Sequence, residues 1–416
     1  MSGAIVSQSR LKPEKIEMRI LIITCWIPYP PIAGFRLRVY NLLQRITREH
    51  EVWLATFVRT PEDLDSILHL QELCQGVESA PHPLLGALAR PVDLFRYALT
   101  GKPVELRLCH SEELVRKIQR LVSKLDFDIV QIEDSHMALY LEALLPEIRR
   151  KTILTFHDVV FNKYNTIYRL EPKLTRKLRL WLYSRSMRRW EPRYAERFGR
   201  CLTVSESDRR LLLAANPRLQ VDVVPNGVDT QMNQPLPYED TTQALVFVGD
   251  MEYRPNIDAV VYFCQEVLPR IRRVIADVEM WIVGINPWPE VGRLDGDGVH
   301  VTGWVDDVRP YYGRSTVCVV PLRAGGGTRL KILEAMALGR PVVSTSIGCE
   351  GLDVIDGEHL LIADSPEQFA EKTVRLLTDE GLREHITTKA RQLVMSRYDW
   401  DVIARRLMQV YAEMAE

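Results

Sequence analysis

Apolar residues along the chain form short runs that alternate with longer segments in which apolar positions recur at helical spacing. Short β-branched runs separated by amphipathic segments are typical of βαβ units, in which helices join parallel strands. The first half has such runs at residues 19–24, 52–57, 128–132, 152–156, 200–204 and 220–224. The second half has them at residues 244–248, 279–283, 299–302, 316–320, 341–344 and 359–362. The pattern predicts an α/β fold with two doubly wound, Rossmann-like domains.

Breaks in this pattern predict where the domains begin and end. Residues 1–17 are expected to form a tail, followed by an N-terminal domain at 18–230. Prolines and polar residues with little apolar content predict a linker at 231–243. We expect a second domain at 244–398, and a last helix at 399–416 that packs back across the domains.

The composition is that of a folded protein without a strong net charge. The 54 Lys and Arg residues balance 55 Asp and Glu residues. A nucleic-acid-binding domain is normally strongly basic, so we expect no nucleic-acid partner. The seven cysteines include no Cys-x-x-Cys pair, and we expect reduced, buried thiols. No apolar run reaches the roughly 20 residues that cross a bilayer, and no signal-peptide core is present at the start. These features predict a cytoplasmic protein.

Glycines and polar residues gather where the predicted strands end. The Pro-rich loop that ends at Gly34 and the pair His157-Asp158 follow strands of the first half, and Gly249 and Gly303 follow strands of the second. In open parallel sheets, ligands bind beyond the carboxyl ends of the strands. We therefore expect one site shared by the two halves, although glycine also ends strands in ordinary turns.

The strongest local signal is a glycine-rich segment between a predicted strand and a predicted helix. Gly325, Gly326, Gly327 and Thr328 allow backbone N–H groups at a helix N-terminus to approach a phosphate. Positive charge comes from Arg323, Arg329 and Lys331. The segment is neither a P-loop nor a Gly-x-Gly-x-x-Gly fingerprint, so it predicts a phosphate-binding loop of another type.

Glu334 is a carboxylate within an apolar part of the helix after this loop. It stands among Leu333, Ala335, Met336 and other apolar residues, where an unpaired charge is costly. It therefore needs a hydrogen-bond donor. Ribose hydroxyls would serve, and an arginine of its own domain is the alternative.

The order of these segments resembles family 4 of the glycosyltransferases, and the resemblance covers almost the whole chain. Besides the Gly34 loop, the matching segments lie at residues 155–157, 203–206, 224–229, 247–249, 301–305 and 333–343. The resemblance implies the GT-B fold, in which two Rossmann-like domains face each other across a cleft. It makes 18–230 the acceptor-side domain and 244–398 the nucleotide-sugar-binding domain. It also implies a retaining transferase that moves a hexose-like sugar from a nucleoside diphosphate sugar to a hydroxyl acceptor, either a glycan or a lipid-linked sugar. No metal or other cofactor is implied.

The resemblance also assigns residues. Glu334 matches the glutamate that holds the ribose hydroxyls, Gly34 the glycine beside the diphosphate, and His157 the catalytic-site histidine that reaches the donor sugar. The loop that borders the base matches Gly303, Trp304 and Val305.

Two departures from the family pattern concern the donor site. Gly326 stands where the family has a second glutamate, eight residues before Glu334. Asp250 and Asn256 stand where the family commonly has Arg and Lys. The positive charge that neutralises the diphosphate is then expected from Arg254, Arg323, Arg329 or Lys331.

Other polar residues suggest an acceptor site and no metal site. Glu133, Asp134 and His136 follow another strand of the first half, where we expect acceptor contacts or, as the alternative, a solvated turn. No His, Cys or carboxylate cluster has the spacing of metal ligands. The Asp-x-Asp motif at 126–128 begins a strand and so lies at the wrong end of the sheet.

Residues 169–200 combine eleven Lys or Arg residues with three Glu and with aromatic residues. An apolar stripe recurs at helical spacing, formed by Leu180, Tyr183, Met187, Trp190, Tyr194 and Phe198. Such a helix can lie on an anionic membrane, which would bring the protein to the cytoplasmic face. The alternative is a stripe packed on its own domain with a solvated basic face.

Two other functions fit the sequence. One is a sugar-nucleotide epimerase on the same fold. The other is a non-catalytic scaffold that binds a nucleotide sugar, which the loss of a glutamate at Gly326 would permit.

Overall fold

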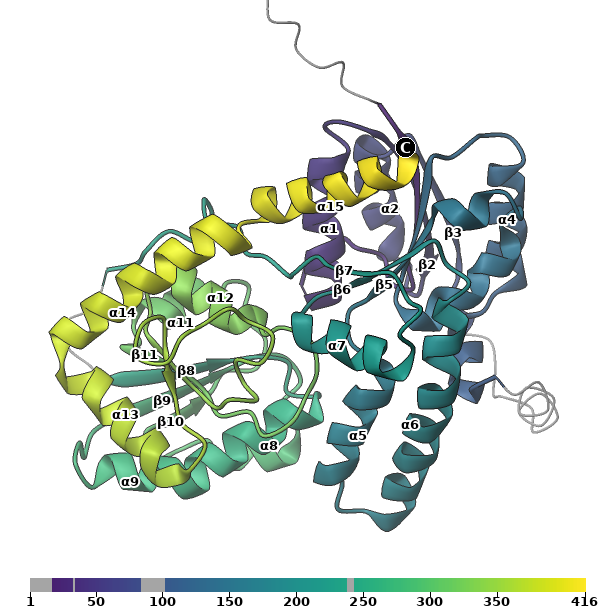
Figure 1. Cartoon of the computed structure of the whole chain (residues 1–416). Coiled ribbons are helices and arrows are strands. Elements are labelled where there is room, and N and C mark those ends of the chain that lie inside the picture. Colours follow the sequence, from purple (N-terminus) through teal and green to yellow (C-terminus); the bar gives the residue numbers. More distant parts are fainter. Residues whose placement is uncertain (1–16, 33, 84–101, 238–242) are drawn as a thin grey trace, which may run out of the picture.

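The computed structural model of the protein describes residues 17–32, 34–83, 102–237 and 243–416. Within them, two parallel sheets lie side by side, each flanked by helices (Figure 1). The first sheet consists of β1 (Arg19–Ile23), β2 (Glu51–Val58), β3 (Gly76–Pro81), β4 (Ile129–Glu133), β5 (Thr152–Phe156), β6 (Arg200–Thr203) and β7 (Val221–Val223). The second consists of β8 (Ala244–Val248), β9 (Glu279–Val283), β10 (Val299–Val301), β11 (Val317–Val320), β12 (Val342–Ser344) and β13 (Leu361–Ile362).

The strand orders are β3-β2-β1-β4-β5-β6-β7 and β10-β9-β8-β11-β12-β13. Both orders reverse direction beside the first strand of their sheet, so the predicted pair of doubly wound domains is confirmed. The strand β3 is an addition to the prediction. Its sequence, GVESAP, has no apolar run because an edge strand needs only one neighbour, which here is β2.

The apolar runs are continuous because both faces of each sheet are covered. In β1, Ile20 and Ile22 belong to one buried cluster, whereas Leu21 and Ile23 belong to the cluster on the opposite face. Alternate residues of a strand point to opposite faces, so a strand between two helix layers needs apolar residues at every position.

Among the described residues, the helices of the first domain are α1 (Gly34–Ile46), α2 (Asp63–Leu73), η2 (Val104–Cys109), α4 (Glu112–Val122), η3 (Ser135–Ala143), η4 (Ile148–Lys151), α5 (Val160–Leu170), α6 (Leu174–Ala195) and α7 (Glu206–Ala215). Those of the second are α8 (Arg254–Tyr262), η5 (Phe263–Val267), α9 (Leu268–Arg272), α10 (Pro289–Gly292), α11 (Arg309–Gly313), α12 (Leu330–Ala337), α13 (Pro366–Thr378), α14 (Glu380–Leu393) and η6 (Val394–Tyr398). The chain ends with α15 (Trp400–Ala415). Several begin at a side chain that accepts a hydrogen bond from a backbone N–H of the first turn, as Ser111 does for α4 and Ser205 for α7.

The last helix returns to the first domain. Along α15, Trp400, Ile403 and Leu407 are buried in the cluster that also holds Ile20 and Leu54 of the first sheet, and α15 lies against α1 (Figure 1). The predicted tail at 1–17, except residue 17, and the centre of the predicted linker, at 238–242, lie outside the described residues. The domain boundaries stay predictions.

A helical hairpin extends from the first domain. The helices α5 and α6 run side by side and reach beyond the end of the sheet (Figure 1). Across the described parts of the chain, no helix combines the length and the apolar content that a membrane span requires.

Candidate active site

Loops at the carboxyl ends of the two sheets are in direct contact. Gly34 begins α1 in the first domain, and a Cβ atom on it would lie 3.4 Å from Cδ1 of Leu330, the first residue of α12. Asn226 Nδ2 donates a hydrogen bond of 2.8 Å to Oγ1 of Thr328. The structure therefore brings the Gly34 loop and the glycine-rich loop together, as the sequence led us to expect.

The glycine-rich loop requires its glycines. Gly325 and Gly327 have φ angles of +131° and +65°, which side chains with a Cβ atom rarely adopt. Arg329 folds back on the loop and donates hydrogen bonds to the carbonyl oxygens of Gly326 and, at 3.0 Å, of Gly327. Its buried Nη2 atom has no hydrogen-bond partner in the described part of the chain. Arg329 thus shapes the loop and keeps one donor for a ligand.

Lys331 places an ammonium group at the end of β8. Its Nζ atom donates to Oδ1 of Asn256 at 3.0 Å and lies 3.8 Å from the centre of the Phe247 ring. A Cβ atom on Gly249 would lie only 2.7 Å from the same Nζ, so a larger residue here would displace the ammonium from its present position. Burial lowers the pKa of Lys331 to about 7. Lys331 therefore brings a cation from α12 to the position where the family pattern has a lysine and this chain has Asn256.

Glu334 follows Lys331 by one turn of α12. Its side chain is half-buried, and burial raises the pKa of its carboxyl group above the ordinary value. Among the described residues, neither an arginine nor any other side chain forms an ion pair or hydrogen bond with this carboxylate. The alternative, in which Glu334 pairs with an arginine of its own domain, is therefore not found among the described residues.

Two predicted cations of the donor site have other partners. Arg254 Nη1 lies 2.9 Å from Oε2 of Glu290. Arg323 forms two hydrogen bonds with the Asp258 carboxylate, at 2.9 and 2.6 Å. Each guanidinium is thus held by a carboxylate of the second domain. Nearby carboxylates therefore neutralise Arg254 and Arg323, and their contact with the diphosphate stays a prediction.

His157 is held by a buried carboxylate. Its Nε2 atom lies 2.6 Å from Oε2 of Glu133, and its ring packs against Phe35 with 4.4 Å between centroids. Glu133 is only 2% exposed. Burial opposes its charge, but the hydrogen bond and positive charge of His157 outweigh burial and lower the pKa of Glu133. Glu133 lies behind His157 and orients it, which corrects its prediction as an acceptor contact.

Further buried groups extend this arrangement. Gln131 donates to Glu133, and Tyr411 of α15 donates to Gln131. The nearby Arg38, which is fully buried, donates to the carbonyl oxygen of Pro225 and to Asn226. Burial lowers the pKa of Arg38 to about 10. A chain of polar contacts therefore connects the last helix with His157.

Asp134 and His136 form a local ion pair. Asp134 has a φ angle of +79°, and its Oδ1 atom lies 2.6 Å from Nδ1 of His136. The other ring nitrogen of His136 lies 2.7 Å from the hydroxyl of Tyr183 on α6. Burial alone would lower the pKa of His136, but the Asp134 charge raises it to about 9. Both ring nitrogens of His136 have partners, so this pair is not the solvated turn of the alternative, and its contact with an acceptor stays a prediction.

Asp158 occupies the space beside Gly326. A Cβ atom on Gly326 would lie 2.8 Å from Oδ1 of Asp158. The other carboxylate oxygen, Oδ2, lies 2.6 Å from Nζ of Lys163. A glutamate at position 326 would collide with Asp158 and place a second negative charge beside it. The first domain therefore supplies a carboxylate at the point where the second domain lacks the family glutamate.

The predicted base-side loop follows β10. Gly303 has a φ angle of +68°, Trp304 is 52% exposed, and Val305 packs against the core of the second domain. The Trp304 indole N–H lies 3.4 Å from Asp306. The loop thus presents an exposed aromatic face.

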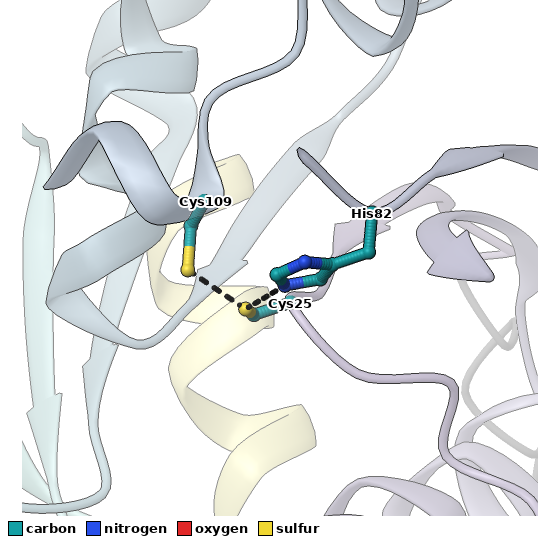
Figure 2. A group of neighbouring side chains, drawn as sticks. All are labelled: Cys25, His82 and Cys109. Carbon is teal, nitrogen blue, oxygen red and sulfur yellow. Dashed lines mark hydrogen bonds between the residues drawn. The ribbon is translucent and has the colours of Figure 1, made fainter. Parts of the chain in front are cut away.

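The sequence prediction missed one group of potential ligands. Cys25, His82 and Cys109 are buried together, with 3.0 Å between the two sulfur atoms and 4.0 Å from Cys25 Sγ to His82 Nε2 (Figure 2). The hydrogen bond between the thiols raises the pKa of Cys25 and lowers that of Cys109. Such donors could hold a soft metal ion, although Arg59 also contacts Nε2 of His82, at 2.8 Å. No spacing rule finds these residues because they come from three distant segments.

Comparisons with known proteins agree with this geometry. The family model Glycosyltransferase Family 4 matches residues 32–232, and the model Glycosyl transferases group 1 matches residues 242–379. The phosphatidyl-myo-inositol mannosyltransferase of Mycolicibacterium smegmatis is 25% identical over 364 residues, which cover 82% of this chain and 88% of that protein.

Solved structures share the fold. Sucrose-phosphate synthase from Thermosynechococcus elongatus has a TM-score of 0.72 at 18% identity, covering 96% of this chain and 99% of that one. Anabaena HepE, solved in complex with UDP and glucose, has a TM-score of 0.67 at 16% identity, covering 95% and 100%. The predicted GT-B fold is confirmed. With one family model matching each half and glycosyltransferases as relatives, the chain belongs to family 4 of the glycosyltransferases.

Proposed function

We propose that the protein is a retaining glycosyltransferase that moves a hexose-like sugar from a nucleoside diphosphate sugar to a hydroxyl acceptor. The observation that carries this proposal is the half-buried Glu334 carboxylate, which has no partner among the described residues and lies one turn from Lys331. A carboxylate in this position needs donors, and two ribose hydroxyls supply them.

The donor diphosphate lies, in this proposal, between Gly34 and the glycine-rich loop. Backbone N–H groups at the start of α12, the free Nη2 donor of Arg329 and the ammonium of Lys331 stabilise its charge. These groups do the electrostatic work that a divalent cation does in other transferases. We therefore propose that the reaction needs no metal ion.

The chemical step requires little from side chains. The bond from the acceptor oxygen to the anomeric carbon forms on the face that the diphosphate leaves, and the bond from that carbon to the diphosphate oxygen breaks. The acceptor proton passes to a diphosphate oxygen. His157, oriented by Glu133, holds the donor sugar, so positioning and charge stabilisation supply most of the rate.

We further propose that Asp158 holds a sugar hydroxyl in place of the missing family glutamate. The support is geometric, since its Oδ1 atom lies beside Gly326 and across from the loop that cradles the diphosphate. The ion pair with Lys163 orients this carboxylate.

The acceptor is, in this proposal, a glycan or a lipid-linked sugar. Support for a lipid comes from the relatives, whose name describes transfer of mannose to phosphatidyl-myo-inositol. The protein would then act in the cytoplasm, at the inner face of a membrane.

Nucleotide binding tests the donor site. In a panel of nucleoside diphosphates and nucleotide sugars with different bases, we expect at least one to raise the melting temperature of the unmodified protein. Glu334→Ala should abolish this stabilisation. Glu371→Ala is the matched control, because Glu371 is an exposed glutamate on α13 of the same domain. Unchanged nucleotide affinity in folded Glu334→Ala would contradict the assignment.

Nucleotide release separates the alternatives. A transferase releases nucleoside diphosphate only when the acceptor is added, whereas an epimerase interconverts the donor alone and a scaffold does neither. Full activity in a chelator supports the metal-free proposal, and activity that vanishes there and returns with Mn²⁺ contradicts it.

A further inference from the structure

The outer face of α6 carries an exposed apolar stripe near the tip of the helical hairpin. Leu174, Leu178, Trp181 and Leu182 are 81%, 58%, 42% and 54% exposed. Their spacing places them on one side of a helix. The predicted stripe lies on the opposite side, where Tyr183, Met187 and Tyr194 are buried in the first domain. The helix therefore carries exposed apolar side chains on its outer face, in addition to those that pack into the first domain.

The same outer face is strongly basic in its second half. Four arginines line a shallow hollow together with Pro192 and Ala215: Arg185, Arg188, Arg189 and Arg193. None of the four forms an ion pair with a described residue. The only acidic residue of α6, Glu191, points inward and accepts hydrogen bonds from backbone N–H groups of α5. This half of the face thus presents positive charge without compensation.

The two halves constrain the partner. Leucines exposed to this extent on a helix favour an apolar environment, and uncompensated arginines favour phosphate or carboxylate groups. A nucleic acid would satisfy the arginines and leave the leucines in water. A lipid surface offers both environments next to each other, because acyl chains lie directly below anionic headgroups.

We propose that the outer face of α6 docks on an anionic lipid surface, with Leu174, Leu178, Trp181 and Leu182 at the acyl boundary and the four arginines on lipid phosphates. The hairpin can reach such a surface because it extends beyond the body of the first domain (Figure 1). Tryptophan suits the headgroup level, since its ring is both apolar and a hydrogen-bond donor.

The role of this docking rests on the proposed function, because the docked face would bring a lipid-linked acceptor to the enzyme. Docking itself is measured without nucleotide or acceptor. A failure of docking is therefore distinguishable from a failure of the transferase assignment, which nucleotide binding tests.

Vesicle sedimentation of the full chain tests docking. We expect binding to vesicles of phosphatidylcholine with phosphatidylglycerol at low salt, release at high salt, and little binding to phosphatidylcholine alone. Changing the four arginines to Gln should weaken binding about tenfold or more. Vesicle binding should shift the fluorescence of Trp181 to shorter wavelength, and the absence of this shift in Trp181→Phe would assign it to that residue. Changing Leu174, Leu178 and Leu182 to Gln should weaken vesicle binding and remove the shift.

The matched control changes Leu64 and Leu68, exposed leucines one turn apart on α2, to Gln. This variant should bind vesicles as the unmodified protein does, and all variants should keep nucleotide-induced thermal stabilisation. Equal sedimentation of the unmodified protein with neutral and anionic vesicles overturns the proposal. The proposal is also overturned if neither the arginine variant nor the leucine variant of α6 weakens vesicle binding. It is overturned as well if the protein binds no vesicles and captures an acidic protein instead.

Discussion

Among the residues of the candidate site, Lys331 should change its charge state when a donor binds. Burial lowers its pKa to about 7, and a diphosphate beside its ammonium would favour the charged form and raise that pKa. Nucleoside diphosphate binding should therefore take up a proton near pH 8, and the affinity should fall as pH rises above about 7. Calorimetry in buffers of different ionisation enthalpy measures this uptake.

Lys331→Met should remove both effects. It should weaken nucleoside diphosphate binding by roughly 10- to 100-fold, because a charge-assisted hydrogen bond is worth about 1.5–3 kcal/mol, and weaken nucleoside monophosphate binding much less. Equal losses of affinity for the diphosphate and the monophosphate, or an unchanged proton uptake, would show that Lys331 does not contact the diphosphate.

Gly326 and Asp158 form the second test at this scale. Because a Cβ atom on Gly326 would lie 2.8 Å from Oδ1 of Asp158, Gly326→Glu should lower stability by about 1–3 kcal/mol and abolish transfer. The double variant Asp158→Gly with Gly326→Glu moves the carboxylate back to the second domain, and we expect it to recover part of both losses. A double-mutant cycle of thermal unfolding and initial rates measures the coupling. If the effects of the two single substitutions simply add in the double variant, Asp158 does not replace the family glutamate.

At the scale of elements, Glu191 joins α6 to the start of α5. It is 1% exposed and accepts hydrogen bonds from the N–H groups of Val160 and Phe161. Burial nevertheless raises its pKa to about 7. A carboxyl group with a raised folded pKa stabilises the fold fully below its unfolded pKa, and this stabilisation is lost as pH rises through about 7.

The free energy of unfolding should therefore fall between pH 5 and pH 8 by up to about 3 kcal/mol on account of Glu191, at about 1.4 kcal/mol per pKa unit. Glu191→Gln should flatten this dependence, as measured by urea unfolding across the pH range. A variant with the same pH slope as the unmodified protein would show that Glu191 is not the group responsible.

At the scale of the whole molecule, the end of the chain completes the site in the first domain. Tyr411 of α15 donates to Gln131, which donates to Glu133, which orients His157. Tyr411→Phe leaves a buried acceptor unsatisfied and should cost about 1–3 kcal/mol of stability. It should also lower kcat more than it raises the donor KM, because the donor contacts of the second domain are unchanged.

Tyr262→Phe provides the comparison. Tyr262 lies on α8 under the Arg323 guanidinium, and no hydrogen bond of its hydroxyl is found among the described residues. This variant should keep both stability and kcat. If Tyr411→Phe has the same stability and kcat as Tyr262→Phe, the last helix does not influence His157.

Much of the fold followed from local patterns. Apolar runs and helical spacing predicted the strands of both sheets, with β3 as the exception because an edge strand has few buried positions. The candidate site followed from position. Gly34 and His157 lie beyond strands of the first sheet and the glycine-rich loop beyond a strand of the second, and each parallel sheet brings the carboxyl ends of its strands to one edge. These inferences depend on residues that are close in the chain.

Which partner each side chain has was decided only by the tertiary structure. The charges of Arg254 and Arg323 look equivalent to that of Lys331 in the sequence, yet carboxylates 36 and 65 residues away hold the two arginines. Asp158 meets Gly326 across the domains, and Cys25 meets Cys109 over 84 residues. The sequence by itself determined the α/β elements and the edge at which the site lies, because short-range sterics and burial dictate them. Electrostatic pairing and the exposed face of α6 depend on long-range packing, which no local pattern encodes.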